Sequence, residues 1–102
     1  MRTANIYMKN QYAGQLIEIA KGKQYRFEYD PNYKGEPISL TIPLKNEVFT
    51  FNEFPAFFDG LLPEGLQLES LLRRAKLDRD DYFGQLITIG KDPIGAVSIE
   101  QQ

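Results

Sequence analysis

Lys91 and two nearby glycines come closest in this sequence to a nucleotide-binding pattern. Gly84 and the pair Gly90-Lys91 resemble a phosphate-binding loop, in which backbone N–H groups and a lysine cradle the phosphates. Five residues separate the glycines where that loop has four, and Asp92 stands where a serine or threonine would bind magnesium. The sequence therefore predicts no phosphate loop.

A second pattern, Asp81-Tyr82-Phe83-Gly84, resembles the metal-binding triplet of protein kinases with one residue inserted. Neither a catalytic-loop signature nor a Gly-rich nucleotide loop accompanies it. Aspartates are expected in the first turn of a helix because the helix dipole favours negative charge there. We therefore interpret Asp78, Asp80 and Asp81 as the start of a helix, with Asp78 as its cap, and predict no metal and no cofactor.

The chain has neither histidine nor cysteine. It therefore lacks the commonest general base, the commonest metal ligand and any thiol nucleophile. Its 14 carboxylates could include an acid and base pair, but none stands out from the strand exteriors and helix starts where solvated carboxylates normally lie. We predict no catalytic residue and no enzyme activity. The absence of cysteine also fits a reducing cytoplasm, where we expect the protein to reside.

Charge and hydropathy argue against two classes of partner. With 12 Lys and Arg against 14 Asp and Glu, the net charge of −2 disfavours the basic face of a nucleic-acid-binding protein. The Phe and Tyr residues could stack on single-stranded nucleic acid, but most fall where a small core needs them. No stretch approaches the roughly 20 apolar residues of a membrane span. We expect no direct contact with nucleic acid or membrane.

The first half of the 102 residues predicts strands. Period-2 alternation or short apolar runs predict five strands there, at residues 4–8, 15–20, 25–30, 38–42 and 48–51, and a sixth near the end of the chain, at residues 94–99. The first two are expected to form a hairpin, with Gly14 at a bend or bulge, and the last to return to the sheet. Because the connections are short, we expect an antiparallel meander of five or six strands.

The second half predicts two or three helices. Pro55 suits a first helical turn, which is expected to continue to Leu62. The next helix has an apolar stripe and is expected to lie on the sheet; its stripe is Leu68, Leu71, Leu72 and Ala75. The last helix is expected to run from Asp78 to Gly90 with Tyr82, Leu86 and Ile89 inward. Residues 1–102 are thus interpreted as one α+β domain.

Residues 54–66, here called the elbow segment, hold more apolar surface than one short helix can turn inward. The sequence Pro63-Glu64-Gly65 interrupts the segment and predicts a protruding bend. An exposed apolar patch of this kind marks a protein contact, whereas a helix-to-helix turn buried under its neighbours would be purely structural. The residues alone leave both interpretations open.

Three blocks resemble the N-terminal subdomain of the HipA family of bacterial serine/threonine kinase toxins. They are Phe58-Asp59-Gly60-Leu61-Leu62-Pro63-Glu64-Gly65, Tyr82-Phe83-Gly84-Gln85-Leu86 and Ile89-Gly90-Lys91-Asp92-Pro93-Ile94-Gly95-Ala96-Val97. The early strands agree, and the resemblance runs from about Ile6 to Ile99. It implies the fold of that subdomain.

The sequence ends at Gln102, where a HipA protein continues into its kinase core. No ATP-binding or catalytic residue of the family is therefore carried over. A free-standing subdomain of this kind resembles HipS, the third component of HipBST toxin–antitoxin systems. That resemblance implies an antitoxin that binds a HipT-like kinase, with a HipB-like DNA-binding protein joined through the kinase.

Our hypothesis is that residues 59–66 of the elbow segment dock on that kinase, with Phe57 and Phe58 as flanking support and Leu66 as the apolar side chain inserted into a cleft. The predicted partner-binding residues are Phe57, Phe58, Asp59, Leu61, Leu62, Pro63, Glu64, Gly65 and Leu66. The start at Met1 and the end just after the last strand favour a complete small gene product. The alternatives are a structural subdomain of a full-length HipA-type kinase and a single-stranded nucleic-acid binder.

Overall fold

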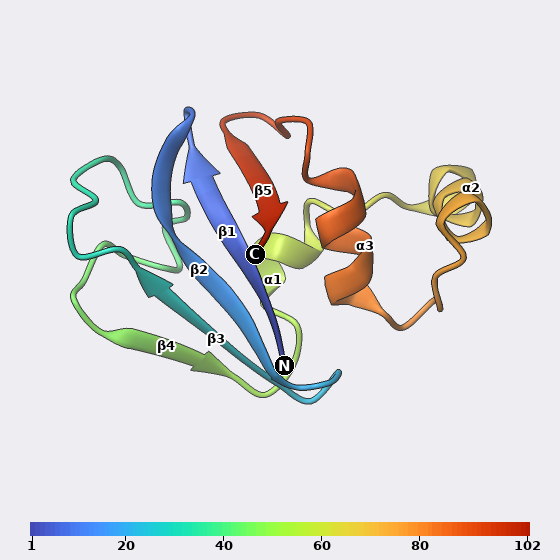
Figure 1. Cartoon of the computed structure of the whole chain (residues 1–102), viewed down its shortest axis with the longest axis horizontal. Helices are drawn as coiled ribbons and strands as arrows, with labels where there is room; N and C mark the ends of the chain where they lie inside the picture. The colour runs from blue at the N-terminus through green and yellow to red at the C-terminus, as the bar shows by residue number, and fades with distance from the viewer.

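A five-stranded antiparallel sheet forms the body of the protein. The computed structural model describes residues 1–102 and places the strands in the order β4-β3-β2-β1-β5 (Figure 1). The strands are β1 (Arg2–Met8), β2 (Gln11–Ala20), β3 (Gln24–Tyr29), β4 (Val48–Phe51) and β5 (Val97–Gln101). The first four form a meander, and β5 pairs with the other edge of β1. The predicted α+β fold class, with its returning last strand, is confirmed.

The β1–β2 hairpin closes through Lys9 and Asn10, whose φ angles are 51° and 66°. Two positive φ angles in a two-residue loop match the twist of the flanking strands. The register then shifts and leaves Ala13 as the extra residue of a bulge beside Gly14. A Cβ atom on Gly14 would lie 2.2 Å from the carbonyl oxygen of Glu28, so the close approach of β3 requires glycine here. The predicted hairpin and bulge are confirmed.

The core lies between one face of the sheet and two helices, α1 (Ala56–Asp59) and α3 (Tyr82–Ile89) (Figure 1). Alternate residues of β3 point into it, so Tyr25 and Phe27 are almost fully buried. The helices contribute Phe58 and Phe83, which are also buried. The aromatic residues therefore supply the core, as the sequence predicted for most of them.

The predicted strand at residues 38–42 is wrong. This segment is a tight turn in which the N–H of Ile42 donates to the carbonyl of Ser39 at 3.1 Å. The hydroxyl of Ser39 accepts from the N–H of Thr41 at 3.1 Å, which competes with a strand ladder. Tyr29 closes the base of the turn: its hydroxyl accepts from the N–H of Ile38 at 3.0 Å and donates to the carbonyl of Ile42.

Helix α2 (Gly65–Ala75) forms where predicted but does not lie on the sheet. It projects from the body and packs beside α3, at the end of the molecule opposite the β3–β4 loop (Figure 1). Of its predicted inward residues, Leu71 is buried, whereas Leu68, Leu72 and Ala75 are only partly covered. The amphipathic period identified the helix, but α1 and α3 already occupy the sheet face.

Two helix boundaries also differ from the prediction. Helix α1 ends at Asp59 instead of Leu62, because single turns replace the helix there. Helix α3 is capped by Asp81 instead of Asp78, whose carbonyl accepts the N–H of Asp81 at 3.1 Å in a preceding turn. Tyr82 is exposed, so its predicted inward position is wrong, whereas the predicted helix end at Gly90 is confirmed.

Candidate protein-binding surface

The first half of the elbow segment is fixed to the sheet by aromatic packing. The ring of Phe54 meets that of Tyr25 edge-on, with centroids 5.3 Å apart. Phe58 packs on Phe27 with centroids 6.1 Å apart, and Phe57 lies edge-on against Phe58 at 5.1 Å. Aromatic pairs at these separations are favourable beyond the area they bury. The segment therefore leaves the core from a rigid base.

The backbone from Asp59 to Leu62 is held by consecutive hydrogen bonds. Asp59 and Gly60 donate their N–H groups to the carbonyls of residues 55 and 56, at 2.9 and 3.0 Å. Leu61 and Leu62 donate to the carbonyls of residues 58 and 59, at 3.0 and 3.1 Å. The side chains of both leucines pack partly against the core. This part of the elbow segment is thus ordered without being a continuous helix.

Gly65 turns the chain into α2. Its φ angle is +59°, a conformation that costs other residues about 1 kcal/mol or more. The preceding Glu64 is extended, with φ −130° and ψ 164°. Leu66 follows at the start of the helix, with 88% of its surface exposed. The predicted protruding bend is therefore present, with an apolar side chain at its tip.

The structure separates the predicted partner-binding residues into three groups. Phe58 is fully buried in the core, which agrees with the supporting role proposed for it and leaves it no surface for a direct contact. Four residues are partly exposed: Phe57, Leu61, Leu62 and Pro63. Four are exposed: Asp59, Glu64, Gly65 and Leu66. Residues 59–66 form a continuous stretch of accessible chain, with Phe57 beside it, and their contact with a partner stays a prediction.

A buried amide fixes the loop between α2 and α3. The side chain of Gln85, which is almost fully buried, donates to the carbonyls of Asp78 at 3.3 Å and Arg79 at 3.0 Å. Arg79 also forms an ion pair with Glu69 of α2. Because a buried polar group without its partners costs about 1–3 kcal/mol, the amide fixes the α2–α3 loop. Sequence reasoning missed Gln85, which the period alone does not distinguish from an exposed position.

Asp81 connects the start of α3 to the sheet. Its carboxylate accepts from the N–H of Gly84 at 3.1 Å and from Arg2 at 2.8 Å, and Arg2 also donates to Glu18 at 2.8 Å. Burial acts to raise the pKa of Asp81, but the hydrogen bonds from Arg2 and Gly84 outweigh it and lower that pKa. The hydrogen bonds to Glu18 and then to Asp81 raise the pKa of Arg2. The capping interpretation of Asp81 is thus supported by its contacts.

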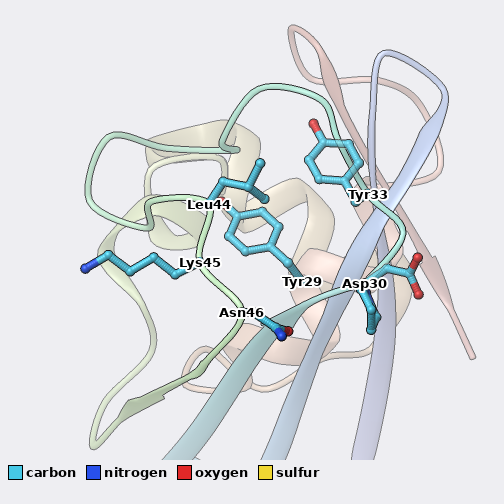
Figure 2. Close-up of a pocket in the computed structure, with 7 residues that line it drawn as sticks. Tyr29, Asp30, Tyr33, Leu44, Lys45 and Asn46 are labelled. Atoms are coloured by element: carbon cyan, nitrogen blue, oxygen red, sulfur yellow. The ribbon is translucent and has the colours of Figure 1, made fainter.

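Tyr29 and Tyr33 line a separate pocket of about 220 Å³ near the β3–β4 loop, where Lys45 and Asp30 point away from the ring of Tyr29 on opposite sides (Figure 2). The two rings stack with an interplanar angle of 3°. Burial is the main cause that raises the pKa of both phenols, although the N–H of Ile38 acts to lower that of Tyr29. Both phenols therefore stay neutral near pH 7 and serve as hydrogen-bonding groups.

Two further features were missed at the sequence level. One face of α2, carrying Gln67, Ser70 and Arg74, lines a groove that begins at Leu66. Their spacing along one helix face is the signal that could have identified it. The other feature is Leu40, which is 98% exposed at the tip of the turn between Ser39 and Ile42.

The structure contains no cluster of three acidic residues that could hold a metal ion. None of its helices is long and apolar enough to span a membrane.

Comparison with known proteins gives the family. A family model described as the HipA N-terminal domain matches residues 4–100. This chain belongs to the HipA N-terminal domain family. The resemblance of the sequence blocks to that subdomain is thereby confirmed.

Two relatives show how the HipA N-terminal domain occurs elsewhere. A solved structure described as the N-terminal domain of HipA toxin matches all of this chain and 93% of that chain, with 27% identity and a TM-score of 0.78. An uncharacterized protein of Haemophilus influenzae is 28% identical over 102 residues, which cover all of this chain and 94% of that protein. The HipA N-terminal domain of this chain is not the catalytic kinase part of a HipA protein.

Proposed function

We propose that this chain is a HipS-like antitoxin of a HipBST-type system, which binds a HipA-like (HipT) serine/threonine kinase toxin in the cytoplasm and restrains it. The observation that carries the proposal is Leu66, an exposed leucine at the tip of a rigid elbow in a HipA N-terminal domain. An inhibitory subunit needs a complementary surface and no reactive group of its own.

The size of one relative supports a free-standing role. The Haemophilus influenzae protein is covered over 94% of its length by this chain, so the HipA N-terminal domain makes up nearly all of that protein. A separate N-terminal domain could act on a kinase only by binding it in trans. A HipB-like DNA-binding protein would then join the complex through the kinase.

The ordered conformation of the elbow segment favours contact with the kinase. Phe54 and Phe58 anchor its first half in the core, and hydrogen bonds order the backbone up to Leu62. A preorganised apolar anchor loses little conformational entropy on binding, which favours affinity. We therefore place the partly exposed and exposed residues from Phe57 to Leu66 in the interface, with Leu66 at its centre.

The alternative is that the chain is the N-terminal structural subdomain of a full-length HipA-type kinase. The solved HipA toxin domain, matched over 93% of its length, favours this second candidate. The elbow segment would then pack on the kinase within one polypeptide. Sequencing the gene beyond codon 102 distinguishes the two: a stop codon supports the antitoxin, and continuation into kinase sequence supports the alternative.

The proposed function is tested with the HipT-like kinase that the proposal expects to be encoded beside this gene. We expect the kinase alone to arrest growth and coexpression of this chain to restore it. With purified proteins, we expect the chain to co-purify with the kinase and to suppress its autophosphorylation as the mixture approaches equimolar amounts. A kinase that stays fully active at saturating amounts of the folded chain would contradict the proposal.

A further inference from the structure

The groove along α2 has a volume of about 440 Å³, larger than the pocket of about 220 Å³ beside Tyr29. Its apolar lining comes from Pro63 and Leu66 of the elbow segment, Leu71 of α2 and Ile89 of α3. Leu71 is only 3% exposed and forms the floor. Hollows of this size accommodate small ligands or a few side chains of a bound peptide.

One cation lies on the rim of this groove without an acidic partner. Arg74 forms no ion pair, and its Nε atom lies 3.4 Å from the hydroxyl of Ser70, which is also on the rim. The acidic residue of α2, Glu69, is already paired with Arg79. The guanidinium of Arg74 therefore has N–H groups left to offer to a carboxylate, for which its planar fork is well suited.

We propose that this groove receives a segment of the kinase in which an apolar side chain is accompanied by a carboxylate. The apolar side chain would cover Leu71 and Ile89, and the carboxylate would accept hydrogen bonds from Arg74. This inference rests on the proposed function and extends it, because it assigns a second contact in which the kinase inserts into this chain. In the first contact, Leu66 inserts into the kinase.

Continuity and charge identify the occupant. Pro63 and Leu66 belong both to the elbow segment and to the groove, so a protein seated on the elbow also covers the groove. The neighbouring cation Lys76 is exposed and unpaired as well, which favours an acidic surface opposite this end of α2. An apolar segment without a carboxylate would leave Arg74 desolvated and unpaired, which is costly.

Charge reversal at two adjacent arginines tests the groove. Arg73 and Arg74 both lie in the last turn of α2, so reversing either changes the net charge and the helix dipole equally, but only Arg74 lines the groove. We expect Arg74→Glu to weaken binding to the purified kinase at least tenfold and Arg73→Glu to weaken it less than threefold. Circular dichroism of both variants should match the wild type.

The outcomes separate the two proposals. The proposal that the groove binds a kinase segment would be overturned if Arg73→Glu and Arg74→Glu lost affinity equally, or if neither lost any. Either result would leave the proposed antitoxin role in place. A wild-type chain that fails to bind the kinase would overturn both. If Arg74→Glu does not fold, Arg74→Gln replaces it, and a loss of at least threefold against an unchanged Arg73→Gln supports the groove.

A photo-crosslinking residue in place of Gln67 identifies the occupant directly. Gln67 is exposed on the rim of the groove, and the same probe at Arg73 serves as a control outside it. We expect the probe at position 67 to join a kinase peptide that contains both an apolar residue and an aspartate or glutamate. A complex that forms without that crosslink, or a crosslinked peptide without an acidic residue, would contradict the proposal.

Discussion

Arg2 and Asp81 lie 79 residues apart in the sequence, and their side chains meet at 2.8 Å. This contact joins β1 to the capping residue of α3. The same guanidinium donates to Glu18 on β2, and it lies over the ring of Phe83 at 5.1 Å from the ring centroid. The first strand therefore fixes where α3 begins, and α3 in turn holds the loop that carries α2.

We expect Arg2→Ala to lower the free energy of unfolding by about 2 kcal/mol or more, because it leaves two poorly exposed carboxylates without their cation. Glu18 is only 4% exposed, so water cannot replace the lost donor fully. Arg2→Lys is the control and should recover part of the loss, since one ammonium cannot match both carboxylates. Urea denaturation measures both variants, and an Arg2→Ala variant as stable as the wild type would contradict the prediction.

The lowered pKa of Asp81 predicts that the free energy of unfolding depends on pH. Its pKa is lower in the folded protein than the usual value, which is roughly 4 for an unperturbed aspartate. The ion pair therefore contributes fully above about pH 4, and its contribution is lost as the pH falls through the lowered pKa of the folded state. Asp81→Asn keeps a capping oxygen for the N–H of Gly84 but does not titrate.

Urea denaturation between pH 3 and pH 7 checks this prediction. We expect Asp81→Asn to be less stable than the wild type at pH 7 and to lose less stability on acidification. The two stability curves should therefore converge toward pH 3. Parallel curves over the whole range would show that Asp81 does not couple folding to protonation.

We expect the hydroxyl of Tyr29 to stabilise the turn that exposes Leu40. Tyr29→Phe removes the hydroxyl that accepts from Ile38 and donates to Ile42, and leaves two backbone groups without that partner. We expect a loss of about 1–3 kcal/mol and faster hydrogen exchange at the Ile38 amide. NMR-detected exchange measures it, with Tyr12→Phe on β2 as a control outside this turn. Unchanged protection of the Ile38 amide in Tyr29→Phe would show that the Tyr29 hydroxyl does not stabilise this turn.

The strands show what periodicity can predict. Residues 25–29 and 38–42 have the same alternation, yet only the first is a strand. In the second, Pro37 and Pro43 remove ladder donors, and the hydroxyl of Ser39 bonds the backbone two residues ahead. Alternation of apolar and polar residues cannot show whether a side chain will hydrogen-bond the backbone in place of a neighbouring strand.

The candidate surface was predictable in part. The excess of apolar residues around a Pro-Glu-Gly break predicts that part of the elbow segment is exposed, and in the structure Leu66 is exposed. The groove was not predictable, because it forms where α2 meets Ile89 of α3, and no local pattern specifies that packing. The conformation of the α2–α3 loop depends in the same way on Gln85, because the sequence does not show that its side chain turns inward to bond the carbonyls of Asp78 and Arg79.

Two exposed leucines allow the docking hypothesis to be tested with a matched control. Leu66 is 88% exposed at the elbow and Leu40 is 98% exposed on the β3–β4 loop, which lies at the opposite end of the molecule (Figure 1). Replacing either with aspartate should change the free energy of unfolding by less than about 0.5 kcal/mol, as is usual for surface positions. Aspartate at position 66 also suits the first turn of α2.

Binding should distinguish the two variants. Leu66→Asp should weaken binding to the kinase at least tenfold, because removing a central apolar anchor costs about 2 kcal/mol or more. Leu40→Asp should bind as the wild type does. Isothermal titration calorimetry on folded samples gives both values. Wild-type affinity in folded Leu66→Asp would reject Leu66 as the anchor, and an equal loss in Leu40→Asp would show that the effect is not specific to the elbow segment.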